Sequence, residues 1–239
     1  YEQAPAFFEQ ALAVFRELHD PQGIASMLMQ LGWAAMRTGD YQTASTRLEE
    51  CLPVLRKSGN TRLRAQALAG LGELAVRQGE FDRAHTLLDQ SLALLEELGD
   101  RWGMAAALGS LGWLALFQRD FKRMTQLLGR SLAIRLEIGE LGGTAWSLEK
   151  LAQAACLQAR DLPNPHRQRG YQRAACLFGT AQALRQPLHS VIDPADLPEY
   201  ERTLELLRRG LGRQAFDAAW AEGSVLPLQE IVALADDPW

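Results

Sequence analysis

The sequence has few cysteines, no long apolar run and no excess of basic residues. Its three cysteines among 239 residues, Cys51, Cys156 and Cys176, form no CxxC pair, so neither a disulfide framework nor a metal or redox site is indicated. Burial as small thiols in a reducing compartment is the simpler interpretation. No window approaches the ~18 uninterrupted apolar residues of a membrane helix. The formal net charge of −4 argues against direct nucleic-acid binding by this stretch of chain.

The sequence also lacks the signatures of leaders and of enzymes. Residues 1–10 contain neither a basic region nor an apolar core, so no secretory signal is indicated. The chain begins without Met inside a helix-like pattern, and we therefore expect further sequence upstream. No GxxxxGK[ST], GxSxG, GxGxxG or HExxH occurs, and the four histidines share no metal-binding spacing. We expect no catalytic residue, no metal site and no cofactor, and hence no enzyme.

What the chain does contain is a repeat with an offset of 40 residues. Apolar residues recur three and four apart in each half of a unit, which predicts two helices per unit. Because a two-helix unit buries its apolar face only against its neighbours, the repeat predicts an all-α superhelical solenoid. The columns that carry the repeat are Leu31-Gly32, Leu71-Gly72 and Leu111-Gly112; Tyr41, Phe81 and Phe121; and Leu48, Leu88 and Leu128.

The register of the repeat predicts the organisation of the chain. We expect a solenoid over residues 1–186, closed by capping helices over 187–239, because an uncapped last unit would expose its apolar face. In the last hairpin, two prolines predict an internal loop over 161–170. The cap is expected within 195–235, with a last helix at 227–234. The solenoid divides into an orphan helix at 4–18 and hairpins at 21–57, 61–97, 101–137 and 141–186.

Two resemblances follow from these segments. The Leu-Gly pair, the turn Gly39-Asp40-Tyr41 and the later Ala44 and Leu48 resemble the tetratricopeptide signature, although the unit is longer than the usual length of about 34 residues. Segments 174–185, 200–202 and 216–223 resemble those that close the solenoids of bacterial multidomain signalling ATPases of the STAND type, such as maltose-type and LuxR-type transcriptional regulators.

The resemblance implies a cytoplasmic module that senses a ligand or protein and regulates an attached ATPase and effector domain. The alternative is a passive protein–protein interaction adaptor without a sensor role. In a tetratricopeptide stack the first helix of each hairpin lines a concave groove, which implies a surface for a peptide, a protein or a small-molecule ligand. No membrane partner is expected.

Candidate groove residues follow from the repeat register, at the position after the Leu-Gly pair and at helical spacings from it. Trp and Arg are typical of binding hot spots. Two interpretations of Trp33 and Trp113 remain open: their rings face a ligand, or they pack between neighbouring hairpins. The candidates are Met29, Trp33, Arg37, Gln66, Glu73, Arg77, Trp113, Phe117, Trp146, Glu149 and Gln153.

Overall fold

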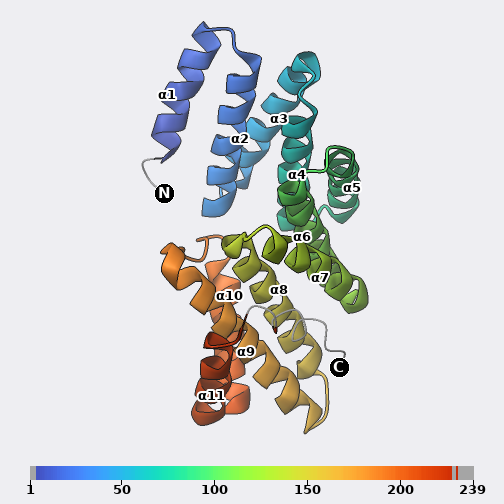
Figure 1. Ribbon diagram of the computed structural model, residues 1–239, viewed down its shortest axis with the longest axis vertical. Helices are drawn as coiled ribbons and strands as arrows, with labels where there is room; N and C mark the ends of the chain where they lie inside the picture. Colours follow the sequence, from blue (N-terminus) through green and yellow to red (C-terminus); the bar gives the residue numbers. More distant parts are fainter. Residues whose placement is uncertain (1–3, 228–229, 231–239) are drawn as a thin grey trace. The chain divides into compact units, whose positions relative to one another are not determined.

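The computed structural model describes residues 4–227 and residue 230. Within that part of the chain every regular element is a helix (Figure 1), and successive helices pack in pairs, which confirms the all-α repeat prediction. The elements are α1 (Ala4–Glu17), α2 (Pro21–Thr38), α3 (Tyr41–Ser58), α4 (Thr61–Gln78), α5 (Phe81–Glu97), α6 (Arg101–Phe117), α7 (Phe121–Glu137), α8 (Leu141–Arg160), α9 (His166–Arg185), the 3₁₀ turn η1 (Gln186–Leu188), α10 (Leu197–Leu211) and α11 (Arg213–Ser224).

Recurring junctions explain why the chain breaks into helices of similar length. Residues 19, 39, 59, 79, 99, 119 and 139 all have positive φ, and all are glycine except His19 and Arg119. A left-handed residue ends a helix, and the residue after it caps the next one. The Asp40 carboxylate accepts the N–H of Thr43 at 3.1 Å, for example. Each 40-residue repeat therefore contains two helices and two such junctions.

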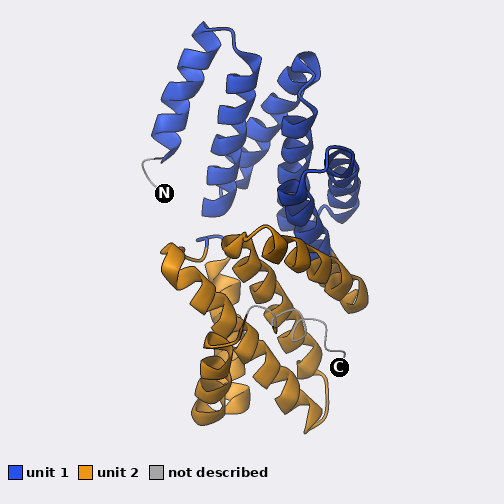
Figure 2. Ribbon diagram, viewed as in Figure 1, with its two compact units in different colours: residues 1–114, 193–195 blue, residues 115–192, 196–239 orange. Residues whose placement is uncertain are grey.

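The described residues fall into two compact units (Figure 2). Unit 1 comprises residues up to 114 together with 193–195, and unit 2 comprises 115–192 and the residues from 196 onward, so α6 begins in unit 1 and ends in unit 2. In unit 1, α2 packs on α3 and α4 on α5. A Cβ on Gly72 would lie 2.6 Å from Cγ of Leu88. The glycine of the Leu-Gly pair thus lets α4 approach α5 closely.

In unit 2, α8 pairs with α9, and α10 and α11 pack on α9. The crossing of α9 and α11 depends on two glycines. A Cβ on Gly223 would lie 1.9 Å from the carbonyl oxygen of Cys176, and one on Gly179 would lie 2.2 Å from that of Trp220. The Thr180 hydroxyl donates to the Gly223 carbonyl at 2.9 Å. The tail segments singled out in the sequence therefore hold the residues of this crossing.

Two boundaries differ from expectation or lie outside the described residues. The loop expected over 161–170 is shorter, because α9 already begins at His166. Pro165 stands just before the helix, where proline leaves the following residues free to be helical, and the buried Gly170 lies within the helix without ending it. The helix expected at 227–234 lies almost entirely outside the described residues. The division into a solenoid over 1–186 and a cap over 187–239 remains a prediction.

Candidate partner-binding surface

Two arginines of the predicted groove occupy the same repeat position, in the last turns of α2 and α4. These two helices pack against each other within unit 1. A cation in the last turn of a helix is favourable, because the partial negative charge of the helix dipole lies at that end. Arg37 and Arg77 are therefore placed by the repeat and stabilised by their helices, but their surroundings differ.

Arg77 is held by residues of its own unit. Its Nη2 donates to Oε1 of Glu73 at 3.1 Å, one helical turn earlier. Its guanidinium lies over the ring of Trp113, with Cζ 4.7 Å from the ring centroid, which is a cation–π geometry. The side chain of Arg77 is only 5% exposed. Its charge is therefore directed at intramolecular partners.

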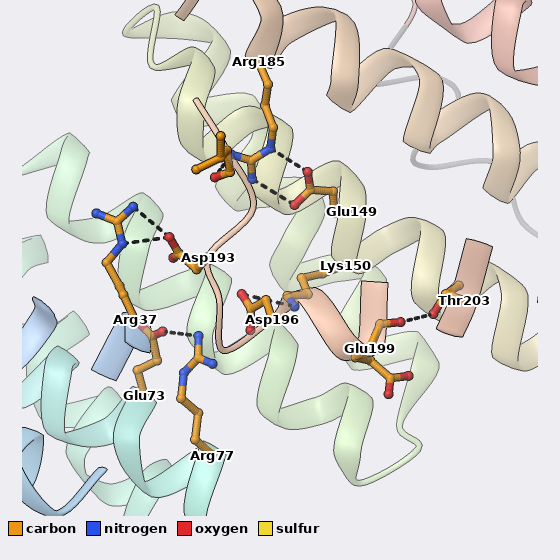
Figure 3. Close-up of polar contacts among 11 residues, drawn as sticks. Arg37, Glu73, Arg77, Glu149, Lys150, Arg185, Asp193, Asp196, Glu199 and Thr203 are labelled. Carbon is orange, nitrogen blue, oxygen red and sulfur yellow. Dashed lines mark hydrogen bonds and ion pairs between the residues drawn. The ribbon is translucent and has the colours of Figure 1, made fainter. Parts of the chain in front are cut away.

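Arg37 instead meets an acidic segment from late in the sequence. Its Nε and Nη2 lie 2.8 and 2.7 Å from Oδ1 of Asp193. The backbone N–H of Ala195 donates to the carbonyl of Arg37 at 3.1 Å. Figure 3 shows the guanidinium directed at the Asp193 carboxylate. Arg37 thus binds the Asp193 carboxylate through its side chain and the Ala195 N–H through its main-chain carbonyl.

The two candidate tryptophans of unit 1, Trp33 and Trp113, are largely covered by the chain. Trp113 is 6% exposed and stacks against Arg77. Trp33 is half-buried, packs against the core of unit 1, and brings its Nε1 to 2.8 Å from the Cβ position of Gly70. For Trp113 the packing interpretation holds, because a ring covered to that degree offers little area to a ligand.

The candidates on α8 are enclosed within unit 2. The Glu149 carboxylate accepts two hydrogen bonds from Arg185, at 2.7 and 2.9 Å, and its side chain is 7% exposed. Arg185 also donates to Oγ of Ser190 at 2.9 Å. Nζ of Lys150 lies 5.5 Å from the ring centroid of the half-buried Trp146 and 3.8 Å from Oδ2 of Asp196. Glu149 is thus held by Arg185 (Figure 3), and the Trp146 ring is contacted by Lys150.

The remaining candidates are divided between core and surface. Met29 is 2% exposed and belongs to the core of unit 1, and Gln153 is 5% exposed. These two side chains therefore support the fold. Gln66 is half-buried, whereas Phe117 is 50% exposed. Repeat position places a residue on a helix but does not fix how deeply the neighbouring helix covers it.

Several polar residues of these contacts were not among the candidates: Lys150, Arg185, Asp193 and Asp196. Lys150 and Arg185 lie outside the groove positions of the repeat. Asp193 and Asp196 stand in the proline-rich break at 187–198, where the repeat gives no register. The signal that could have found them is Asp193 directly before Pro194, followed by a second aspartate at position 196.

The described residues contain neither a metal-binding cluster nor a cysteine with a lowered pKa. They contain no group of His, Cys, Asp and Glu that could hold a metal ion. Burial raises the pKa of Cys51 and of Cys156 to about 12 and that of Cys176 to about 11. Thiols with such pKa values stay protonated and are poor nucleophiles. Among the helices that the structure describes, none has the length and apolar character to cross a membrane.

Comparison with known proteins identifies the repeat. A model of the tetratricopeptide repeat family matches residues 1–57 and 23–97. No curated protein matches the sequence. Among solved structures, the fold resembles the crystal structure of BtubC (BKLC) from P. vanneervenii, with a TM-score of 0.61 and 20% sequence identity, over 97% of this chain and 92% of that one. This similarity shows a shared fold. The chain thus contains a tetratricopeptide-like domain, and such repeats indicate a protein–protein interaction module.

Proposed function

We propose that this chain is the sensor module of a cytoplasmic signalling protein, binding a protein or peptide on unit 1 and regulating an attached ATPase and effector domain. The observation that carries the binding half is the contact of Arg37 with Asp193 and Ala195. There a tetratricopeptide-like surface already holds a short piece of polypeptide through a charged hydrogen bond and a main-chain hydrogen bond. Charge-assisted hydrogen bonds are the stronger kind and give a preference for acidic ligands.

The sensor half is supported by the tail of the chain. Segments 174–185 and 216–223, which resemble those closing the solenoids of signalling ATPases, hold the glycines of the α9–α11 crossing. The resemblance therefore includes glycines that the close contact between α9 and α11 requires, and does not rest on amino-acid composition alone. A partner can regulate the attached domains only through different affinities for their resting and active states. The module itself contributes no catalysis and no binding to duplex DNA.

The first test is the gene sequence on both sides of this stretch. An open reading frame that also encodes a nucleotide-binding loop and an effector domain is the expected result. An open reading frame that encodes neither would refute the sensor role and favour the passive adaptor. The adaptor would still bind its partner through the same repeats, because the tetratricopeptide match does not depend on an attached ATPase.

The second test measures regulation in the full-length protein. The rate of ATP hydrolysis is followed while a synthetic acidic peptide copying residues 190–198 is added. We expect the rate to change by roughly fivefold or more, the usual range for coupled sites. The response should be lost in Arg37→Glu and kept in the matched control Arg16→Glu, which alters an exposed ion pair with Glu50 elsewhere in unit 1. An ATPase indifferent to saturating peptide would contradict the sensor role.

A further inference from the structure

The segment of residues 193–195 lies on unit 1 as a ligand would. Asp193 supplies the carboxylate, Ala195 supplies the N–H, and Pro194 between them has no N–H and a fixed φ. Residues 193–195 are assigned to unit 1, although the residues on either side of them in the sequence belong to unit 2 (Figure 2). Their place on Arg37 is therefore a contact between positions 156 residues apart in the sequence.

The contact has the character of an exchangeable one. The side chains of Arg37 and Asp193 are 44% and 24% exposed, so water competes for both charges and salt screens them. Both side chains keep contact with water, so each charge stays partly solvated when the pair separates. A tethered segment nevertheless competes strongly with a free one, because its effective concentration is on the order of millimolar.

Resting on the proposed function, we propose that Arg37 is the anchor of a binding site for acidic extended peptides and that residues 193–195 occupy this site as an internal competitor. The partner presents an Asp or Glu, followed two residues later by an available backbone N–H. Arg37 binds the carboxylate with its guanidinium and the N–H with its carbonyl oxygen. The partner must displace the chain's own segment before it can bind.

The test uses the whole chain and a fluorescent peptide that copies residues 190–198, with fluorescence anisotropy as the readout. Asp193→Ala removes the internal competitor, and Asp161→Ala is its matched control, since Asp161 forms an exposed ion pair with Arg119 at 3.2 Å. If the segment occupies the site about nine-tenths of the time, its removal strengthens the apparent affinity about tenfold. The control should bind as the unaltered chain does.

Arg37→Glu should abolish peptide binding in both the unaltered and the Asp193→Ala backgrounds, whereas Arg16→Glu should not. A peptide with Asn in place of its first Asp should bind poorly to every variant. Circular dichroism checks that the variants are folded, and Arg37→Gln serves if Arg37→Glu is not. Equal affinity for the unaltered chain and Asp193→Ala would overturn the competition. Peptide binding that survives the loss of Arg37 would overturn the site.

A second readout follows the displaced segment itself. Saturating peptide should accelerate hydrogen exchange at the Ala195 amide, because that N–H loses the Arg37 carbonyl. Unchanged exchange in the presence of bound peptide would show that the two do not compete. The binding experiments do not depend on the ATPase. Peptide binding without a change in ATP hydrolysis refutes the sensor role alone. Absence of peptide binding refutes this inference and makes the peptide unusable in the ATPase assay, so the sensor role is then tested by the gene sequence on both sides of this stretch.

Discussion

The crossing of α9 and α11 allows a test in which a single methyl group is decisive. In Gly223→Ala the new Cβ would lie 1.9 Å from the carbonyl oxygen and 2.7 Å from the carbonyl carbon of Cys176. Non-bonded carbon atoms normally stay ~3.5 Å or more apart. Because both contacts are with backbone inside α9, no side chain can rotate away. The two helices must move apart, or α11 must unwind locally.

The cost can be estimated from its parts. Overpacking of a tight contact costs about 1–3 kcal/mol. Separation of the helices also weakens the hydrogen bond from Thr180 to the Gly223 carbonyl, which contributes about 1 kcal/mol. Alanine recovers roughly 0.5–1 kcal/mol, because glycine is a poor helix residue. The free energy of unfolding should therefore fall by about 1–3.5 kcal/mol, which lowers Tm by roughly 2–14 °C for a chain of this size.

The measurement is thermal and urea denaturation followed by circular dichroism. Gly142→Ala is the matched control, since its Cβ would meet only one side-chain atom, Oε1 of Glu140 at 3.2 Å, and no backbone atom of another helix. The control should melt at the original Tm or slightly above it. If the two units melt separately, only the transition of unit 2 should shift. A Gly223→Ala chain that melts with the control would refute the close crossing.

Three further predictions concern a turn, an ion pair and the thiols. Arg119→Gly should raise the free energy of unfolding by about 0.5–1 kcal/mol in urea titrations, because Arg119 has a φ of 58° and left-handed backbone is costly for residues other than glycine; a loss of stability would contradict this. Glu149→Gln should lower the free energy of unfolding by about 2–4 kcal/mol in the same assay, since it removes the carboxylate that pairs with the largely buried Arg185. An unchanged free energy of unfolding would show that this pair adds no stability. Burial raises the pKa of Cys51 and of Cys156 from 9.0 to about 12, so the folded chain keeps protons that the unfolded chain releases. The free energy of unfolding should therefore fall as pH rises from about 9 to 12. Alkylation of the two thiols in the folded chain at pH 8 should be slow, and rapid labelling would contradict their burial.

Much of the fold follows from local chemistry that can be read in the sequence. A glycine that ends one helix and a polar residue that caps the next are signals within four residues of each other, and the 40-residue offset repeats them. His19 and Arg119 take the same left-handed conformation without glycine, because the packed helices on either side fix the turn. Stacking of such hairpins determines the fold class but not the depth at which a given side chain lies.

The candidate site was harder to predict, because its decisive contact is long-range. The repeat register identified Arg37, yet nothing in the local sequence pairs it with Asp193, which lies 156 residues later in a segment without a repeat. The burial of Met29 and Trp113 could not be predicted from the sequence either, since it depends on how neighbouring helices cover the same helical face. Local patterns therefore singled out Arg37, and only the tertiary structure shows Asp193 beside it.

The different roles of the two equivalent arginines can be traced to the residue one turn before each. Glu73 precedes Arg77 by four positions and pairs with it, which is the favourable order of an acid and a base in a helix. The corresponding position before Arg37 is Trp33, which offers no carboxylate. The same repeat position thus holds one arginine that contacts Glu73 and Trp113 and one whose charge is paired by Asp193. The residue one turn earlier, Glu73 in one repeat and Trp33 in the other, thus accounts for why Arg77 is paired by a carboxylate within its own helix and Arg37 by Asp193.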